Sequence, residues 1–498
     1  MTPTGRLMRS TGPLWLGVDL GTQQARALVV DDDGHVFGAG SAPLTSTRGA
    51  GRHEQDPRQW WAAVADATRA ALAGLPADAV AALAVTATSG SVLLVDSAGN
   101  PRTEALMYDD ARAVAEAGAV DDAGAALWRS LGYTHMQPTW ALPKLLWLLN
   151  RQPELVDDAT RLCHQADLIT ARFVGHLVPT DASNALKSGY DLVRERWPDE
   201  VLTILGIPPQ LLPAVVRPGT VLGRVGPDAA ALTGVPAGIP VVAGMTDGCA
   251  AQLGAGCVGI GSWNSVLGTT LVLKGVSAQL IHDPAGSLYC HRGPDGTWLP
   301  GGASNCGAGV VTEWFPGADL ADLTARAARL PIGPMAYPLL AQGERFPFRA
   351  LDAETFLLGR PATGPGVFAA LLLGVACLER LCFDRVTMLG APTHGTLTFT
   401  GGASRNEYWS QMRTDMLGRQ VHIPEQNEPA LGMAILAATS SGRSANEAVA
   451  TMVRRRGERT PNTARASELT GHYAQFLEAL TTRGWLDNAT ATYAAARL

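Results

Sequence analysis

Two apolar runs of this 498-residue chain each end in an aspartate that is surrounded by small residues. The runs are LWLGVDLGTQQAR at 14–26 and IPVVAGMTDGCAAQLGAG at 239–256, and the aspartates are Asp19 and Asp247. The first run predicts a strand, a tight turn and a second strand, whereas the second run predicts a strand that leads into a helix. Each half of the chain is expected to start with a strand–turn–strand unit, which predicts a duplicated α/β fold with a central cleft.

The residue types around the two aspartates indicate phosphate chemistry. Gly17, Gly21 and Thr22 are expected to leave the backbone of the first turn uncovered, so that its N–H groups can face an anion. Asp247 is expected at the start of a helix, where unpaired N–H groups keep a carboxylate ionised. Each feature alone also fits an ordinary hairpin turn or helix cap. Together they predict phosphoryl transfer.

Composition narrows the class of protein. The length predicts two domains of roughly 200–250 residues. A formal net charge of −6 gives no electrostatic reason to expect nucleic acid as a partner. Seven scattered cysteines without a CxxC pair indicate reduced thiols and a cytoplasmic protein. The first twelve residues lack the apolar segment of a signal peptide, and no run approaches about 18 apolar residues, so we expect no membrane partner.

Local patterns predict several further elements. Strands are expected at 80–86 and 91–96, and an amphipathic helix is expected within 53–75, with Asp56 as its N-cap and Pro57 as its first residue. Alanine-rich helices are expected at 430–440 and 444–453, followed by a helical tail at 461–498.

Two more glycine turns complete the pattern. Leu267-Gly268-Thr269-Thr270 lies between apolar runs, and Thr400-Gly401-Gly402-Ala403-Ser404 lies between a predicted strand and a helix that contains Asn406 and Trp409. The turns at 17–22 and 267–270 could together hold a triphosphate, and the turn at 400–404 could admit a flat adenine ring. The GxGxxG string at 254–259 follows a helix and not a strand, which argues against a dinucleotide site.

The order of these motifs resembles the FGGY carbohydrate kinases, which have duplicated actin-like, ribonuclease H-like ATPase domains. The resemblance rests on DLGT with Arg26, HEQDPRQWW, the Asp247 segment, LGTT and GGASRNEYW. It implies an N-terminal domain at 1–243, which binds sugar and carries the first phosphate turn. It also implies a catalytic, nucleotide-binding domain at 244–498 with a helical tail after about residue 440.

The resemblance also implies roles for individual residues, with ATP and Mg²⁺ as cofactors and a small sugar as the partner. Asp247 would be the general base, and the sugar would contact Asp19, Ser89, Asp110 and Asp247. Asp19 would also hold Mg²⁺ through water. The nucleotide would be bound by Gly21, Thr22, Gln23, Gly268, Thr269, Asn305, Gly402, Ala403, Asn406 and Trp409. A homodimer is the candidate assembly.

The sugar-side segments favour one branch of this family. Xylulokinases typically carry a QMHG-like turn and a WNDGR-like segment, whereas this chain has TATSG at 86–90 and YDDAR at 108–112. TSGSVLLVDSAGNPRTEALMY, SNALKSGYD, GASNCGAG and GERFP resemble the D-ribulose kinases more closely. We therefore expect phosphorylation of the 5-hydroxyl of D-ribulose, with D-xylulose or another polyol as the alternative. Gln23 and Gln24 replace the small Ser-Gly that often follows this turn, which bears on sugar fit.

Other functions and roles remain open at this point. A non-catalytic ATP-binding sensor of the same fold is one alternative, and a two-carboxylate glycosidase built on Asp19 and Asp247 is another. His53 and Glu54, which accompany the Asp56 cap, are expected to have a structural or domain-packing role.

Overall fold

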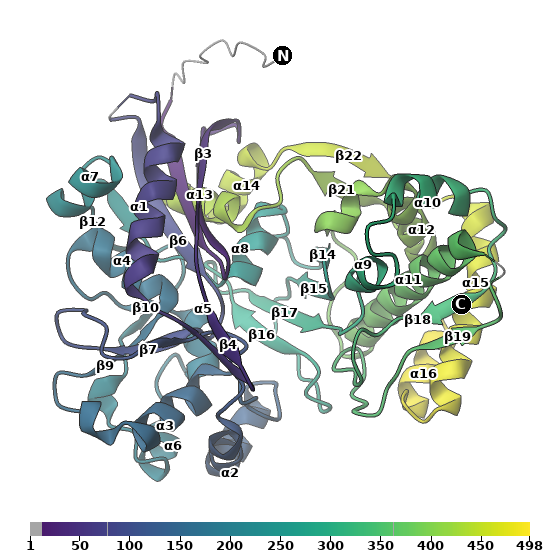
Figure 1. The fold of residues 1–498 in the computed structure, drawn as a ribbon, viewed down its shortest axis with the longest axis horizontal. Helices are drawn as coiled ribbons and strands as arrows, with labels where there is room; N and C mark the ends of the chain where they lie inside the picture. The colour runs from purple at the N-terminus through teal and green to yellow at the C-terminus, as the bar shows by residue number, and fades with distance from the viewer. Residues whose placement is uncertain (1–11, 77, 362) are drawn as a thin grey trace. The chain divides into compact units, whose positions relative to one another are not determined.

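The computed structural model describes residues 12–76, 78–361 and 363–498, so the first eleven residues, on which the signal-peptide expectation partly rests, lie outside it. Contacts divide the chain into two compact units (Figure 1). Unit 1 contains the chain up to Val258 together with His291–Thr297 and Gln426–Arg454. Unit 2 contains Gly259–Cys290, Trp298–Glu425 and Arg455–Leu498. Unit 1 therefore includes a segment from near the end of the sequence. This division differs from the expected boundary at 243/244, because Asp247 belongs to unit 1.

A six-stranded sheet forms the centre of unit 1, in the order β12-β13-β6-β1-β2-β3. Its strands are β1 Leu14–Leu20, β2 Gln24–Val30, β3 Val36–Pro43, β6 Val80–Ala87, β12 Val221–Arg224 and β13 Pro240–Val242. β1 pairs antiparallel with β2 and parallel with β6. The predicted strand–turn–strand unit is therefore confirmed.

The two faces of β1 carry different residues because side chains alternate along a strand. Leu16, Val18 and Leu20 belong to a core cluster with residues of α1 (Arg58–Leu72) and α4 (Gln165–Val174). Gly17 and Asp19 therefore share the opposite face. That face is covered by α13 (Pro429–Ala438), which packs against β1, β2 and β6.

Backbone contact between α13 and its neighbours explains why Gly17 is a glycine. A Cβ atom at Gly17 would lie 1.8 Å from the carbonyl oxygen of Ala430. At Gly432, on the same helix, a Cβ atom would lie 2.0 Å from the carbonyl oxygen of Ala250 in α8 (Asp247–Gly254). The expectation that Gly17 leaves an open turn backbone was wrong, because Gly17 lies mid-strand beneath α13.

The helix predicted within 53–75 begins later than expected. Residues Arg52–Gln55 form β5, α1 starts at Arg58, and Pro57 occupies the N-cap position. Asp56 nevertheless accepts a hydrogen bond from the backbone N–H of Arg58, at 2.9 Å. The expectation that Asp56 is the N-cap and Pro57 the first helical residue was therefore wrong, although the Asp56 side chain still contacts the helix start. β5 belongs to a five-stranded sheet with β4 Thr47–Gly49, β7 Val92–Val95, β8 Ala105–Leu106 and β9 Arg161–His164.

The remaining elements of unit 1 surround these sheets. They are α2 Val114–Ser130, α3 Ala141–Arg151, β10 Thr180–Asp181, α5 Ala182–Ala185, α6 Asp199–Ile204, β11 Val215–Val216, α7 Pro227–Thr233 and α14 Ala445–Met452.

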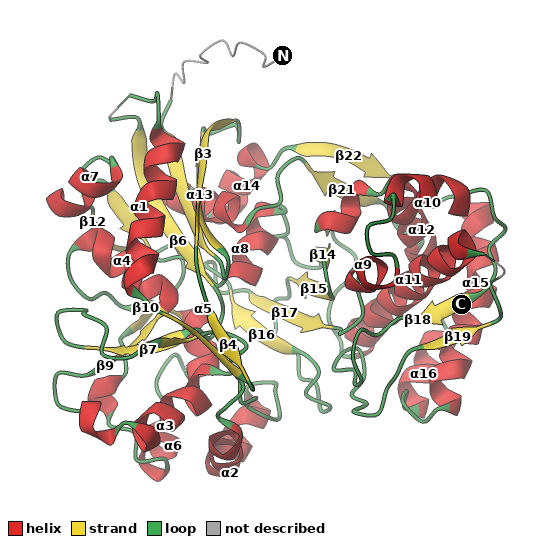
Figure 2. Cartoon of the chain, in the orientation of Figure 1, coloured by secondary structure: helices red, strands yellow, loops and turns green. Residues whose placement is uncertain are grey.

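Unit 2 is built on a further sheet, several strands of which are labelled in Figure 2, and its strand order includes β17-β15-β14-β20-β21-β22. These are β14 Trp263–Leu267, β15 Leu271–Gly275, β17 Trp298–Ala303, β20 Leu397–Thr400, β21 Val421–Pro424 and β22 Arg455–Arg459. β16 Tyr289–Arg292 begins in unit 2 and ends in two residues that are assigned to unit 1. The other elements of unit 2 are α9 Gly309–Trp314, α10 Leu320–Ala327, β18 Met335–Tyr337, β19 Phe356–Leu358, α11 Gly364–Met388, α12 Glu407–Leu417, α15 Thr463–Thr482 and α16 Asn488–Ala495. The predicted helical tail is confirmed as α15 and α16.

One helix contradicts the expectation that no long apolar run is present. Within the described ranges, α11 is the helix that is long and apolar enough to cross a membrane by length and composition, and 78% of its most apolar window is buried inside the protein. Its Glu379 forms a fully buried ion pair with Arg413 of α12, with 2.6 Å between oxygen and nitrogen. Such burial is typical of a core helix, and pairing makes a buried charge tolerable.

We predict that Gly17→Ala destabilises the protein by at least about 1–3 kcal/mol, because the methyl group overlaps the α13 backbone. Gly118→Ala is the matched control, since Gly118 lies in α2 and its Cβ would meet no atom within 4 Å. That control should be stabilising by about 0.5–1 kcal/mol. Chemical denaturation of both variants measures the difference, and equal stabilities would contradict the close approach.

Candidate active site

Asp19 lies at the end of β1, where it is 3% exposed and 3.5 Å from the guanidinium of Arg26. Burial raises its pKa to about 7. The negative charge of Asp247 adds to this rise, Arg26 opposes it, and Glu428 contributes a smaller increase. The two aspartates singled out by the sequence therefore interact electrostatically within unit 1. Glu428, the N-cap residue of α13, is a third acidic neighbour that the sequence analysis missed.

Asp247 is the first residue of α8, so the predicted position at a helix start is confirmed. Its carboxylate accepts a hydrogen bond from the backbone N–H of Gly248, at 2.7 Å. The side chain is only partly buried. The positive end of the helix dipole favours a negative charge at this position.

The first turn is held from outside by a residue that the sequence analysis did not select. Gln55 is buried, and its side-chain amide donates to the carbonyl oxygen of Thr22 at 2.7 Å. Trp60 in turn donates its indole N–H to the Gln55 oxygen at 2.6 Å. Gly21 donates its N–H to the carbonyl of Gln24, at 3.1 Å. The HEQDPRQWW motif could have pointed to Gln55, because it places a side-chain amide shortly before helix α1.

Ser89 lies in the loop after β6, and its hydroxyl oxygen is buried without a hydrogen-bond partner in the described part of the chain. Two lysines hold this loop by its backbone. Lys144 donates to the carbonyl of Gly90, and Lys187 donates to that of Ser89 at 3.0 Å. Burial lowers the pKa of Lys144 to about 7. The two lysines therefore hold the backbone of this loop beside the Ser89 hydroxyl.

Asp110 is fully buried, and both of its carboxylate oxygens are engaged. Its Oδ2 atom accepts from the backbone N–H of His53 and from the Nη2 atom of Arg112, both at 2.8 Å, and its Oδ1 atom accepts from the Nε atom of Arg112 at 3.1 Å. Arg112 also pairs with Glu54 and lies over the Trp147 ring, 4.5 Å from its centroid. His53 and Glu54 thus take part in a local packing network, as expected, and the contacts of Asp110 in this structure are with His53 and Arg112.

Unit 2 contains a cavity of about 890 Å³ that gathers most of the nucleotide residues expected there. The predicted residues that line it are Gly268, Thr269, Gly402, Ala403, Asn406 and Trp409. Asn305 is not among the lining residues, and its side chain donates to the carbonyl of Gly343 at 2.9 Å. The structure therefore brings two of the predicted glycine turns to one cavity and leaves Asn305 outside it.

Local geometry explains how the two turns meet. Gly401 has φ +83°, and a Cβ atom there would lie 2.4 Å from the carbonyl oxygen of Leu267, at the end of β14. Asn406 caps α12 by accepting from the N–H of Trp409, at 3.0 Å. Small residues thus form one wall, and Phe368 and Trp409 supply apolar surface. A cavity of this kind suits a flat aromatic ring with a polar attachment.

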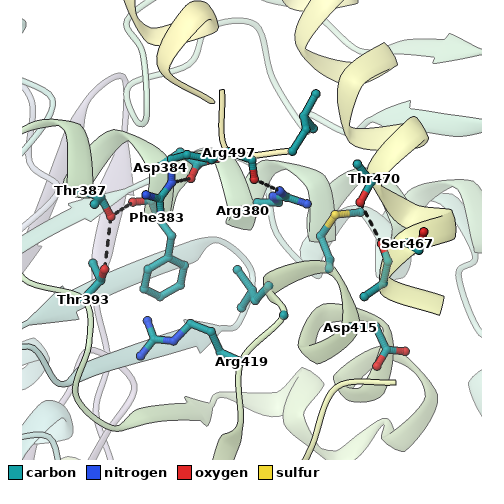
Figure 3. A pocket seen from close by; sticks show the side chains of 15 residues that line it. Arg380, Phe383, Asp384, Thr387, Thr393, Asp415, Arg419, Ser467, Thr470 and Arg497 are labelled. Atoms are coloured by element: carbon teal, nitrogen blue, oxygen red, sulfur yellow. Dashed lines mark hydrogen bonds and ion pairs between the residues drawn. The ribbon is translucent and has the colours of Figure 1, made fainter. Parts of the chain in front are cut away.

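A second cavity in unit 2, of about 370 Å³, contains none of the predicted site residues (Figure 3). Its charged groups largely satisfy one another. Asp384 accepts from Arg497 at 2.9 Å and from the hydroxyl of Tyr473 at 2.7 Å, and Arg380 donates to the carbonyl of Arg497 at 2.8 Å. These contacts tie the C-terminal residues to α11.

The unit 1 carboxylates fit a hard divalent cation. Mg²⁺ prefers oxygen ligands and usually retains several waters. Burial is the main cause of the raised pKa of Asp19, and repulsion from Asp247 and Glu428 adds to it; a nearby cation would relieve that repulsion.

We predict that Asp19→Asn stabilises the metal-free protein more at pH 8 than at pH 5. The folded-state pKa is about 7 against an ordinary 3.8, so stability from this carboxyl is lost as the pH rises toward 7. The stabilisation by Asp19→Asn should be about 2–3 kcal/mol larger at pH 8 than at pH 5, since one pKa unit corresponds to about 1.4 kcal/mol. Denaturation in EDTA measures it, with the exposed Asp33→Asn as the control. A gain that does not vary with pH would contradict this electrostatic account.

Comparison with known proteins places the chain in a family. Residues 14–254 match the N-terminal domain of the FGGY family of carbohydrate kinases, and residues 261–441 match its C-terminal domain. The xylulose kinase of Streptomyces rubiginosus is 34% identical over 438 residues, which cover 86% of this chain and 88% of that protein. The xylulose kinase of Escherichia coli is 28% identical, over 85% and 89% respectively.

A solved structure agrees with these matches. The crystal structure of xylulose kinase from Rhodospirillum rubrum superposes with a TM-score of 0.85 and 26% identity, covering 94% of this chain and 98% of that one. The expected pair of actin-like α/β domains is therefore confirmed. The chain belongs to the FGGY family of carbohydrate kinases.

Proposed function

We propose that the protein transfers the γ-phosphoryl group of ATP to the terminal hydroxyl of a ketopentose. The observation that carries this proposal is the electrostatic coupling of Asp19 to Asp247, because it places two carboxylates of different character together. Asp19 is buried with a raised pKa, whereas Asp247 begins a helix and is partly exposed. Different environments suit the two groups to different tasks.

Asp247 acts as the general base in this proposal. Its carboxylate accepts the proton of the terminal hydroxyl as that oxygen attacks the γ-phosphorus, a contribution of about 10²–10⁴-fold in rate. Asp19 contacts the sugar and would hold Mg²⁺ through water, and the cation would supply charge neutralisation at the phosphates. Glycine turns and fixed loops supply the positioning on which phosphoryl transfer mainly depends.

The nucleotide is assigned to the large cavity of unit 2. Gly402 and Gly268 both line it, and a Cβ atom at either position would meet nothing within 4 Å. A ligand can therefore approach the backbone of both turns. We also propose the cytoplasm as the site of action, where ATP is available.

The similarity to xylulose kinases favours D-xylulose as the sugar. D-ribulose is the second candidate, because the loop at 86–90 reads TATSG and offers the unpartnered hydroxyl of Ser89 in place of the QMHG-like turn typical of xylulokinases. Ser89 and Asp110 are the residues proposed to select between these sugars.

We predict that the protein releases ADP from Mg-ATP in the presence of a ketopentose. A coupled ADP-release assay over D-xylulose, D-ribulose, L-ribulose and glycerol ranks the sugars by kcat/KM. Preference for D-xylulose supports the assignment drawn from the relatives, and preference for D-ribulose supports the one drawn from Ser89. ATP binding without turnover on any of these sugars would instead favour a sensor and overturn the proposal.

Asp247→Asn is the matched test of the base in the same assay. It should lower kcat by about 10²–10⁴-fold, since the amide cannot accept the hydroxyl proton. ATP binding should persist, because the assigned nucleotide cavity lies in unit 2. The exposed Asp33→Asn serves as control, and normal turnover of Asp247→Asn would refute the mechanism.

We predict that Gly402→Val weakens ATP binding by about tenfold or more, equivalent to about 1.4 kcal/mol. The new side chain would enter the cavity without striking the protein, so the melting temperature should not change. Gly457→Val is the control, because Gly457 lies on β22, away from the cavity lining, and its Cβ also meets no atom within 4 Å. Titration calorimetry measures both variants, and equal affinities would remove ATP from this cavity.

A further inference from the structure

The residue that precedes Asp247 is hydrogen-bonded to a distant segment of unit 1. The backbone N–H of Thr246 donates to the hydroxyl oxygen of Ser183 in α5, at 2.9 Å, and the contact is buried. The Ser183 hydroxyl donates in turn to the Oδ1 atom of Asp181, at 2.5 Å. A chain of two hydrogen bonds therefore links a buried carboxylate to the loop that carries the proposed base.

Asp181 is itself held rigidly. Its Oδ1 atom also accepts from the backbone N–H groups of Ser183 and Asn184, at 2.8 and 3.1 Å. Its Oδ2 atom accepts from the side-chain amide of Asn184, at 2.6 Å. A serine hydroxyl has a single hydrogen. Since Asp181 takes that hydrogen, the Ser183 oxygen faces Thr246 as an acceptor only.

The opposite side of the same loop is fixed by β6. Thr86 donates its hydroxyl to the carbonyl of Met245 at 2.6 Å, and Ala87 forms a parallel bridge with Thr246. The dipeptide before Asp247 is therefore clamped from β6 and from α5. Loss of the hydrogen bond to Ser183 would leave the backbone that leads into α8 held from β6 alone, and its direction would be less well defined.

The short helical turn Leu186–Ser188, which directly follows α5, also reaches the proposed sugar loop. Lys187, four residues after Ser183, donates to the carbonyl of Ser89 at 3.0 Å. One short stretch of chain thus contacts the backbone beside the proposed base and the backbone of a proposed sugar residue. Such a stretch can fix the distance between the two, which is what an in-line transfer requires.

We propose that Ser183, oriented by Asp181, is a positioning residue that sets the direction of Asp247 toward the acceptor hydroxyl. This inference rests on the proposed kinase function. Ser183 is fully buried and acts through the Thr246 amide, so it has no direct part in the chemistry.

Ser183→Ala should reduce kcat by about 10–100-fold, because small displacements of a catalytic group have large effects on rate. The KM for ATP should stay unchanged, since the assigned cavity lies in unit 2. Ser183→Thr retains the hydroxyl and should recover most of the lost kcat. A residue that served only overall stability would not separate kcat from KM in this way.

Hydrogen exchange gives a readout that does not depend on any substrate. Mass spectrometry of a peptide covering residues 243–250 should show faster exchange in Ser183→Ala than in the wild type or Ser183→Thr, because the Thr246 N–H loses its acceptor. Ser130→Ala is the matched control, since Ser130 is an exposed serine at the end of α2. If Ser183→Ala does not fold, Ser183→Cys is used, because a thiol keeps the volume but accepts hydrogen bonds poorly.

The outcomes separate this inference from the proposed function. A wild-type protein that phosphorylates no sugar overturns both. An active wild type with unchanged kcat in Ser183→Ala overturns only the positioning role, as does unchanged exchange at 243–250. Faster exchange, lower kcat and recovery by Ser183→Thr together support it.

Discussion

Backbone-to-backbone packing of α13 determines the arrangement of unit 1. At Gly17 the helix approaches β1 so closely that no side chain fits, and at Gly432 it approaches α8 in the same way. Because protein interiors are close-packed, such contacts define relative positions to within fractions of an ångström. The end of β1, the start of α8 and the start of α13 are therefore held together, and Asp19, Asp247 and Glu428 lie at these three ends.

The electrostatics of the site follow from that packing. Asp19 shares a strand face with Gly17, so it lies beneath α13, where burial and two acidic neighbours raise its pKa. Asp247 begins a helix and keeps an exposed side. The same supporting pattern recurs at three loops of the proposed site, because side chains from other segments hold the backbone of each loop. Gln55 holds Thr22, Ser183 holds Thr246, and two lysines hold the loop of Ser89.

Much of this arrangement could be predicted from the sequence, because short-range patterns specify it. The β1–β2 hairpin, the helix that starts at Asp247 and the glycine turns around the unit 2 cavity all come from residues close together in the chain. Long-range packing could not be predicted in this way. From the sequence alone Gly17 is interpreted as a turn glycine, because only the packing of α13 explains why no side chain fits there. The apolar length of α11 was overlooked because charged residues interrupt it. Ser183 has no local signal at all, since its partner Thr246 lies 63 residues away.

The late position of α13 in the sequence has a consequence for biosynthesis. Ribosomes add about 5–20 residues per second, and domains generally fold as they emerge. The face of β1 that carries Gly17 and Asp19 stays without its covering helix until residues 429–438 have been made. The nascent chain therefore exposes an incomplete acidic centre through most of its synthesis. A product that stops before α13 lacks the helix that covers Gly17 and Asp19, so the proposed site is complete only in chains that extend beyond residue 438.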